Sequence, residues 1–201
     1  MGFSQKHKQR THSKILDAAG ELFRVEGLQG ASVDRVMRAA GHTVGGFYGH
    51  FDSKEKLVLA TLARVLERQM EAWLEGLSHL QGAAWAGAYL SRYLTRKNRD
   101  ASVCALPAVV PDVARGGRAV RETFASGLGA LVDAVAQQIG GPGSRERALG
   151  LIAMAFGSLA LAKACRGTPL SDGLLRGARR AAVSLAGKPT RGPMTARKRH
   201  R

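Results

Sequence analysis

The amino-acid sequence predicts an all-α protein, and three observations support this fold class. Apolar residues recur every three or four positions in almost every segment, which places them on one face of a helix. No segment shows the sustained alternation of apolar and polar residues that is typical of a strand. Glycine, proline and helix-capping residues separate the periodic segments. With 201 residues, 45% of them apolar and 23% charged, the composition is ordinary for a globular chain and excludes general disorder.

Four helices are expected in the first part of the chain, over residues 11–26, 33–40, 43–50 and 54–77. Gly27 follows the first of them, at the position where glycine often ends a helix. Ser32, Thr43 and Ser53 each precede an apolar run and are residue types that cap helix N-termini. Gly41 supplies the backbone freedom for a tight turn between the second and third helices.

The rest of the chain predicts longer, alanine-rich helices, which brings the expected total to about nine. They cover residues 83–96, a short broken stretch between 102 and 117, a segment that ends at 139, and residues 145–164 and 171–186. Pro107 and Pro111 limit the broken stretch, because proline lacks the amide hydrogen and clashes with the preceding turn. Residues 188–201 carry cations and almost nothing to bury, so we expect a disordered basic tail.

The charge balance indicates a polyanionic partner. The chain has 31 Lys and Arg against 15 Asp and Glu, a net charge of +16, and much of the excess lies at its two ends. Basic ends on a mildly basic body favour nucleic acid first and an anionic membrane surface second. The longest strongly apolar uncharged stretch, Ala148 to Ala162, is too short to cross a bilayer and is expected to be a buried helix. Neither a membrane span nor a targeting segment is expected, and cytoplasm is the predicted compartment.

Catalytic and metal-binding patterns are not evident in the sequence. Cys104 and Cys165 lie far apart and outside any C-x-x-C pair, so we expect free thiols, with no disulfide and no zinc site. No Ser/His/Asp order, Cys/His pairing, carboxylate pair or phosphate loop stands out. The sequence therefore predicts a protein that is not an enzyme and that needs neither a metal nor another cofactor.

Residues 32–57 carry the most specific pattern in the chain. Two short helices joined by a turn at Gly41 predict a helix-turn-helix, whose second helix is narrow enough to enter the major groove of DNA. Phe47 and Phe51 lie four residues apart and are expected to anchor that helix to the first one. Three glycines reduce its intrinsic helix stability, but they let its backbone lie close against a partner.

The pattern extends through Ile15-Leu16-Asp17-Ala18-Ala19, Glu21-Leu22-Phe23, Ala39-Ala40-Gly41 and Gly45-x-Phe47-Tyr48-x-His50-Phe51-x-Ser53-Lys54-Glu55-x-Leu57. In these residues the chain resembles the DNA-binding half of the TetR family of bacterial transcriptional regulators. The resemblance implies a homodimer on double-stranded DNA, a divergent C-terminal domain that binds a small effector, and usually repression. By position it implies DNA contacts from Ser32, Thr43, Val44, Gly45, Gly46, Tyr48, His50 and Lys54. His42 departs from the family pattern, which commonly has an aliphatic residue there.

The helix expected over residues 145–164 is apolar on more than one face, so both sides need cover. Together with the last helix it predicts a two-fold, four-helix dimer interface. The expected interface residues are Leu149, Gly150, Ile152, Gly157, Leu161, Leu174, Ala178 and Leu185. A central helix in a larger monomeric core is the alternative interpretation.

A mainly apolar or electrophilic effector is expected to bind between the middle helices of the chain. The candidate lining residues are Met70, Trp73, Tyr89, Tyr93, Cys104, Phe124 and Phe156. The same residues also describe an ordinary apolar core, and Cys104 is either a redox-sensitive thiol or a small buried hydrophobe.

Four parts follow from these observations: a basic arm over 1–10, a helix-turn-helix domain over 11–57, an effector-binding and dimerisation domain over 58–187, and a basic tail over 188–201. The expected function is a sequence-specific transcriptional repressor, associated with the bacterial nucleoid when bound, that an effector releases from a palindromic operator. A nonspecific DNA-coating protein driven by net positive charge is the alternative.

Overall fold

The computed structural model describes residues 2–28, 30, 32–101 and 104–187, with side chains from residue 5 onward. Within these ranges the chain forms nine α-helices and one 3₁₀-helix and no strand, which confirms the predicted all-α fold. The helices are α1 (Gly2–Glu26), α2 (Val33–Ala39), η1 (Val44–Gly49), α3 (Lys54–Leu74), α4 (Gly82–Tyr93), α5 (Arg96–Ala101), α6 (Leu106–Arg115), α7 (Arg118–Ile139), α8 (Ser144–Ala164) and α9 (Pro169–Ala186). The tail expected over 188–201 lies outside the described residues.

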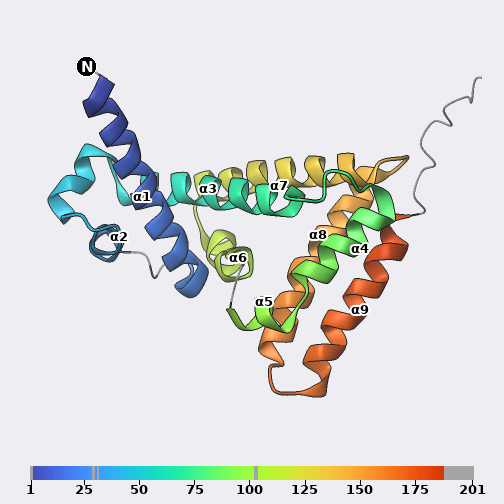
Figure 1. The fold of residues 1–201 in the computed structure, drawn as a ribbon. Helices are drawn as coiled ribbons and strands as arrows, with labels where there is room; N and C mark the ends of the chain where they lie inside the picture. Colours follow the sequence, from blue (N-terminus) through green and yellow to red (C-terminus); the bar gives the residue numbers. More distant parts are fainter. Residues whose placement is uncertain (1, 29, 31, 102–103, 188–201) are drawn as a thin grey trace, which may run out of the picture.

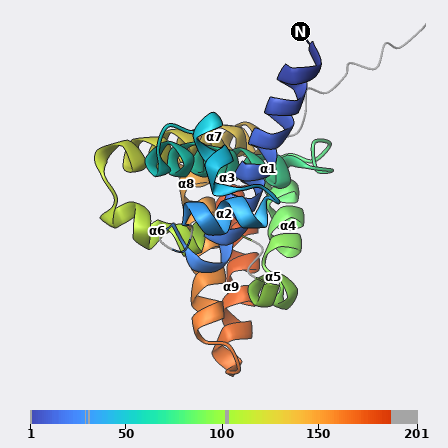
Figure 2. The same cartoon turned by 90° about the vertical axis from the view of Figure 1, so that its left-hand side faces the viewer.

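The molecule has a small head at one end and a larger helical body at the other. In Figure 1 the head consists of α1, α2 and η1, and α3 runs from it beside α7 into the body. In the body, α8 packs against both α7 and α9, and α9 also packs against α4. The turned view places α1 and α2 in front of α3 and α7 (Figure 2).

A compact apolar centre holds the head together, and α3 belongs to both parts of the molecule. The buried residues of the head include Ile15, Phe23, Val36, Met37, Phe47, Phe51 and Leu57. Leu57 lies in the first turn of α3, whereas Trp73 lies in its last turn and is fully buried in the body. A rigid α-helix therefore connects the head to the interior of the body.

Two helix ends and one helix type in the first part of the chain differ from the sequence prediction. The first helix begins at Gly2 rather than at residue 11, because residues 3–19 contain neither glycine nor proline and offer the helix no stop. The third helix is a 3₁₀-helix, a form that proteins use for short pieces, and its three glycines disfavour a regular α-helix. α3 ends at Leu74 rather than at residue 77, and Gly76 follows with a φ of +67°.

The helix that was expected over residues 83–96 ends early, and an additional short helix, α5, follows it. α4 ends at Tyr93, and the side-chain amide of Asn98 donates hydrogen bonds to the carbonyls of Arg92 and Tyr93 at 3.0 and 2.8 Å. The Thr95 hydroxyl accepts a hydrogen bond from the amide of Asn98 at 3.1 Å. These contacts satisfy carbonyls at the end of one helix and an amide at the start of the next, so the chain turns at this point.

A second connection joins the head to the body through α6. The Asp112 carboxylate accepts a buried hydrogen bond of 2.7 Å from the backbone amide of Leu28, in the turn after α1. Gly27 in the same turn has a φ of +73°, and a Cβ atom there would lie 2.5 Å from the Asp112 carboxylate. The turn thus needs glycine for its backbone conformation and for the close approach of Asp112.

Candidate DNA-binding surface and effector cavity

The turn between α2 and η1 sets the position of the candidate recognition segment. Ser32 caps α2, and its hydroxyl accepts a hydrogen bond from the Arg35 amide at 3.3 Å. After α2 the chain reverses at Gly41, which has a φ of +75°, and the His42 amide donates to the Met37 carbonyl at 2.9 Å. Thr43 occupies the N-cap position of η1 but makes no capping hydrogen bond through its side chain, contrary to the capping role expected for it.

η1 is anchored on one side and open on the other. Phe47 and Phe51 are 1% and 5% exposed, and their stacked rings lie 5.7 Å apart. Tyr48, between them in the chain, is 72% exposed and touches Phe47 edge-on. An added Cβ atom at Gly45 or Gly49 would meet no described atom within 4 Å. The backbone of η1 is therefore directly accessible to a partner on the side opposite the phenylalanines.

Most of the residues expected at DNA lie in or beside η1. Thr43, Val44, Gly45, Gly46 and Tyr48 are exposed, and Lys54 is exposed in the first turn of α3. Ser32 is exposed at the start of α2, where its hydroxyl already serves as a helix cap. His50 is half-buried at the end of η1.

Histidines gather on this side of the head, and only His50 was expected to act there. His42 and His50 are half-buried, and His42 Nε2 and His50 Nδ1 have no hydrogen-bond partner among the described residues. Burial lowers the pKa of His50, and the nearby His12, Lys8, His42 and His7 lower it further. Sequence reasoning missed His12, which lies in α1 but stacks on Phe51 with ring centroids 4.5 Å apart.

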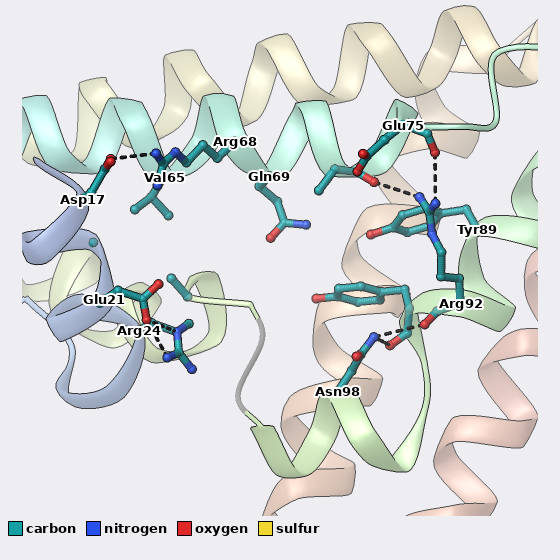
Figure 3. Close-up of a pocket in the computed structure, with 14 residues that line it drawn as sticks. Asp17, Glu21, Arg24, Val65, Arg68, Gln69, Glu75, Tyr89, Arg92 and Asn98 are labelled. Atoms are coloured by element: carbon teal, nitrogen blue, oxygen red, sulfur yellow. Dashed lines mark hydrogen bonds and ion pairs between the residues drawn. The ribbon is translucent and has the colours of Figure 1, made fainter. Parts of the chain in front are cut away.

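A cavity of about 370 Å³ lies where α1, α3, α4 and α5 approach one another (Figure 3). Tyr89, Tyr93 and Gln69 line it, and Gln69 extends into the space between α1 and the tyrosines. Several charged side chains around it already have partners: Arg68 pairs with Asp17 at 2.7 Å, and Arg24 pairs with Glu21 at 2.6 Å. Arg92 donates hydrogen bonds to the carbonyls of Ala72 and Glu75. The cavity therefore offers an aromatic wall, one amide and a polar rim whose charges are largely engaged.

The seven residues expected to line one effector pocket are distributed over several places. Only Tyr89 and Tyr93 line the cavity of Figure 3, and Trp73 stacks behind Tyr89 at 4.1 Å between ring centroids. Phe156 meets Trp73 edge-on within the same aromatic cluster. Met70 lines a separate groove between α3 and α7, Cys104 lines another beside α6 and α8, and Phe124 packs partly buried against the core. Sequence reasoning missed Gln69, a polar residue with no distinctive spacing in α3.

Cys104 has the character of a buried neutral thiol. It is 4% exposed, and its Sγ donates a hydrogen bond to Gln69 Oε1 at 3.0 Å. Burial raises the pKa of the Cys104 thiol to about 11. Burial likewise raises the pKa of the Tyr89 phenol, so both groups are neutral near pH 7. These values disfavour a reactive thiolate at Cys104 in this conformation.

α8 and α9 present an apolar face that no other part of the described chain covers. Leu149 and Leu161 of α8 are 50% and 56% exposed, and Leu170 of α9 is 60% exposed. By length and composition α8 is apolar enough to cross a membrane, yet only 33% of its most apolar stretch is buried in the chain. This low burial differs from the buried helix expected from the sequence.

The eight residues expected at a dimer interface divide between this face and the interior. Leu149, Leu161 and Leu185 are exposed, Gly157 and Leu174 are half-buried, and Ile152 and Ala178 are buried within the chain. A Cβ atom at Gly150 would lie 3.0 Å from Leu185 Cδ2, so this glycine allows α8 and α9 of one chain to pack closely. At Gly157 and Gly177 an added Cβ would meet no described atom within 4 Å, which leaves room for another helix.

Residues 15–61 match the family model described as bacterial regulatory proteins, tetR family. The regulator SrpR of Pseudomonas putida is 40% identical over 55 residues, which are 27% of this chain and 26% of SrpR. UidR of Escherichia coli K12, also described as an HTH-type transcriptional regulator, is 34% identical over 71 residues, 35% of this chain and 36% of UidR. The matched segments thus span only about a quarter to a third of these relatives.

Solved structures extend the likeness to the body of the molecule. The reduced form of E. coli NemR matches with a TM-score of 0.72 at 19% identity, over 85% of this chain and 96% of NemR. A TetR-family regulator of Cytophaga hutchinsonii matches with a TM-score of 0.72 at 17% identity, over 90% of this chain and 98% of that one. Residues 15–61 therefore carry the sequence of the tetR family model, and the chain as a whole has the fold of solved TetR-family regulators.

Proposed function

We propose that this protein is a homodimeric, sequence-specific DNA-binding regulator of transcription, and a repressor that a small effector releases from a palindromic operator. The observation that carries the proposal is the open side of η1. Its glycines leave the backbone exposed, while Phe47 and Phe51 hold it against the head on the opposite side. The segment also lies within the residues that match the tetR family model.

The exposed groups on η1 suit two different kinds of DNA contact. Tyr48, Lys54 and the Thr43 hydroxyl can bind phosphates, which set the register of a protein on DNA but carry no base information. Val44 and the glycine backbone lie between them and are assigned to the base edges in the major groove. Because glycines have no side chain to read bases, DNA shape contributes to specificity at these positions.

The apolar face of α8 and α9 supports a homodimer. An uncovered apolar face of this kind commonly marks a protein interface, and a two-fold axis pairs the same face on each copy. A second copy fits this face better than lipid does, because Arg176 and Arg180 are also exposed on α9. The resulting four-helix interface places two heads on one DNA duplex, as a palindromic operator requires.

The cavity of Figure 3 is the proposed effector site. It touches α1 of the head as well as α3 and α4 of the body, so a ligand there contacts both parts that must move relative to each other. The expected ligand is mainly apolar, with a polar group for Gln69. A coupling of about 1–3 kcal/mol between the two sites is typical of such regulation. The proposed place of action is the bacterial cytoplasm, at the nucleoid, and the proposed activity is binding rather than catalysis.

Selection of bound sequences from a random DNA pool tests the proposal. We expect one enriched palindrome, whose preference over competitor DNA persists as salt is raised. A Lys54→Ala variant is expected to lose affinity for all sequences, whereas Lys97→Ala removes the same charge from an exposed position of α5 and leaves affinity unchanged. Enrichment of no sequence, with binding that declines uniformly with salt, would instead indicate nonspecific DNA coating.

A further inference from the structure

A groove of about 640 Å³ separates α1 from η1 on the side of the head that carries Tyr48. It exists because α1 begins nine residues earlier than residue 11, so that its first turns pass beside the end of η1. Lys8 and His12 of α1 line one wall, and Tyr48 and His50 line the other. Arg64 of α3 is the lining residue that comes from outside α1, η1 and the segment just after η1, and the groove adjoins the surface assigned to DNA.

The histidines decide the charge of the groove. Arg64 of α3 lines it, but its guanidinium is bound to Asp17 at 3.3 Å and to the Ser13 hydroxyl at 3.1 Å. Asp52 is the acidic residue among the lining side chains, and it offsets the charge of Lys8. With neutral imidazoles the groove is close to electrically balanced, and each protonated histidine adds one positive charge to it.

The surroundings of His50 favour its neutral form in the free protein, and His12 lies directly beside it. His12 stacks on Phe51 and lies 6.0 Å from His50 between ring centroids. The groups that face His50 are Lys8, His7 and His12 from α1, His42 from the turn, Tyr48 and Asp52 near η1, and Arg64 from α3. Burial and the surrounding positive charges lower the pKa of His50, and the negative charge of an entering phosphate opposes the effect of those charges.

We propose that this groove binds a phosphate of the DNA backbone beside the bases that η1 contacts, and that His12 and His50 take up protons from solvent as it binds. The inference rests on the proposed DNA-binding function and adds a second contact region, built from α1. A group that binds protons only in the complex makes affinity rise as pH falls. DNA binding by this protein is therefore coupled to pH between about 6 and 8, the range in which histidines titrate.

The test is a titration of the full chain with a fluorescent duplex taken from the selected pool, at constant salt and at several pH values. Affinity is expected to rise about tenfold from pH 8 to pH 6, which corresponds to one proton taken up across about one pH unit. The dependence of log affinity on log salt is expected to steepen by about 1 at the lower pH, because one more phosphate is neutralised. The double variant His12→Phe/His50→Gln is expected to flatten both responses, while His12→Phe keeps a ring stacked on Phe51.

His79→Gln is the matched control, since this exposed histidine lies between α3 and α4, far along the chain from the groove, and its variant must keep the full response. NMR of the histidine ring protons gives a second measurement that does not depend on a variant that folds. The pKa values of His12 and His50 must rise when DNA binds, and that of His79 must not. Binding with no pH response, or a response that survives in the double variant, overturns the inference. Absence of DNA binding at every pH would instead contradict the proposed function.

Discussion

Two surfaces of this molecule lack a cover within the described chain, and their chemistry differs. The open side of η1 consists of glycine backbone, Tyr48 and flanking polar groups, whereas the open side of α8 and α9 exposes leucines, alanines and glycines, with Arg176 and Arg180 also exposed on α9. The first surface offers hydrogen-bonding groups and positive charge to a polyanion. The second offers apolar area, which is stabilised only when another apolar surface removes it from water. Exposure alone therefore does not identify a binding partner; the atoms exposed do.

The largest expected effect comes from placing a charge on the apolar face. Leu161→Glu buries an unpaired carboxylate in the proposed dimer interface, so we expect a monomer by light scattering. Operator affinity is expected to fall by at least about a hundredfold, because two linked heads bind far more tightly than one. Val110→Glu, at a residue of α6 that is 45% exposed, is the control and keeps the dimer. A dimeric Leu161→Glu protein would contradict the assignment of this face.

The next effect tests how the head is held to the body. Asp112→Ala leaves the buried amide of Leu28 without its acceptor, at a cost of about 1.5–3 kcal/mol, the usual range for a hydrogen bond to a charged group. Chemical unfolding measures this loss. Arg115→Ala removes the exposed ion-pair partner of Asp112 but keeps the buried bond, and it is expected to cost about 0–1 kcal/mol. Equal losses in the two variants would show that the Asp112–Leu28 bond does not hold the head.

A glycine substitution separates folding from DNA contact on η1. Gly45→Ala adds a Cβ atom into open space, so the melting temperature is expected to stay the same or to rise slightly. Operator affinity is expected to fall about tenfold, because the added methyl group holds the backbone away from the groove, an effect of about 1.4 kcal/mol. Gly117→Ala, at an equally open position before α7, serves as the control for both measurements. Unchanged affinity of the Gly45 variant would show that close approach of the η1 backbone to DNA does not contribute to binding.

The smallest expected effect concerns the thiol of Cys104, beside α6 and α8. With a pKa of about 11, Cys104 remains protonated at pH 7.5, so a thiol reagent is expected to modify the half-buried Cys165 first. A Cys165→Ser variant isolates the slow reaction of Cys104. Because the folded state holds the Cys104 proton more tightly than the unfolded chain does, stability is expected to decline as pH rises from 9 to 11. Rapid modification of Cys104 at pH 7.5 would show that the region around this buried thiol becomes accessible to solvent in the folded protein.

Sequence reasoning succeeded where local residues alone decide the structure. Ser32 and Ser53 cap their helices as expected, and Gly41 adopts a positive φ in the turn between α2 and η1. Phe47 and Phe51 are buried and hold η1 against the head. Reasoning was less accurate where neighbours in space decide. The length of α1, the break that Asn98 creates between α4 and α5, and the contact of His12 with Phe51 have no periodic signature in the sequence.

By itself the sequence determined the all-α fold, the helix-turn-helix head and the family of that head, because helical periodicity, caps and turn glycines act within a few residues of one another. Only the tertiary structure decided which apolar residues form core and which form an open face, and which polar residues share a cavity. Gln69 lines the same cavity as Tyr93, and His12 lies beside His50, because separate helices pack together at those points. Distances between side chains from different helices depend on the packing of the whole chain, which no local pattern encodes.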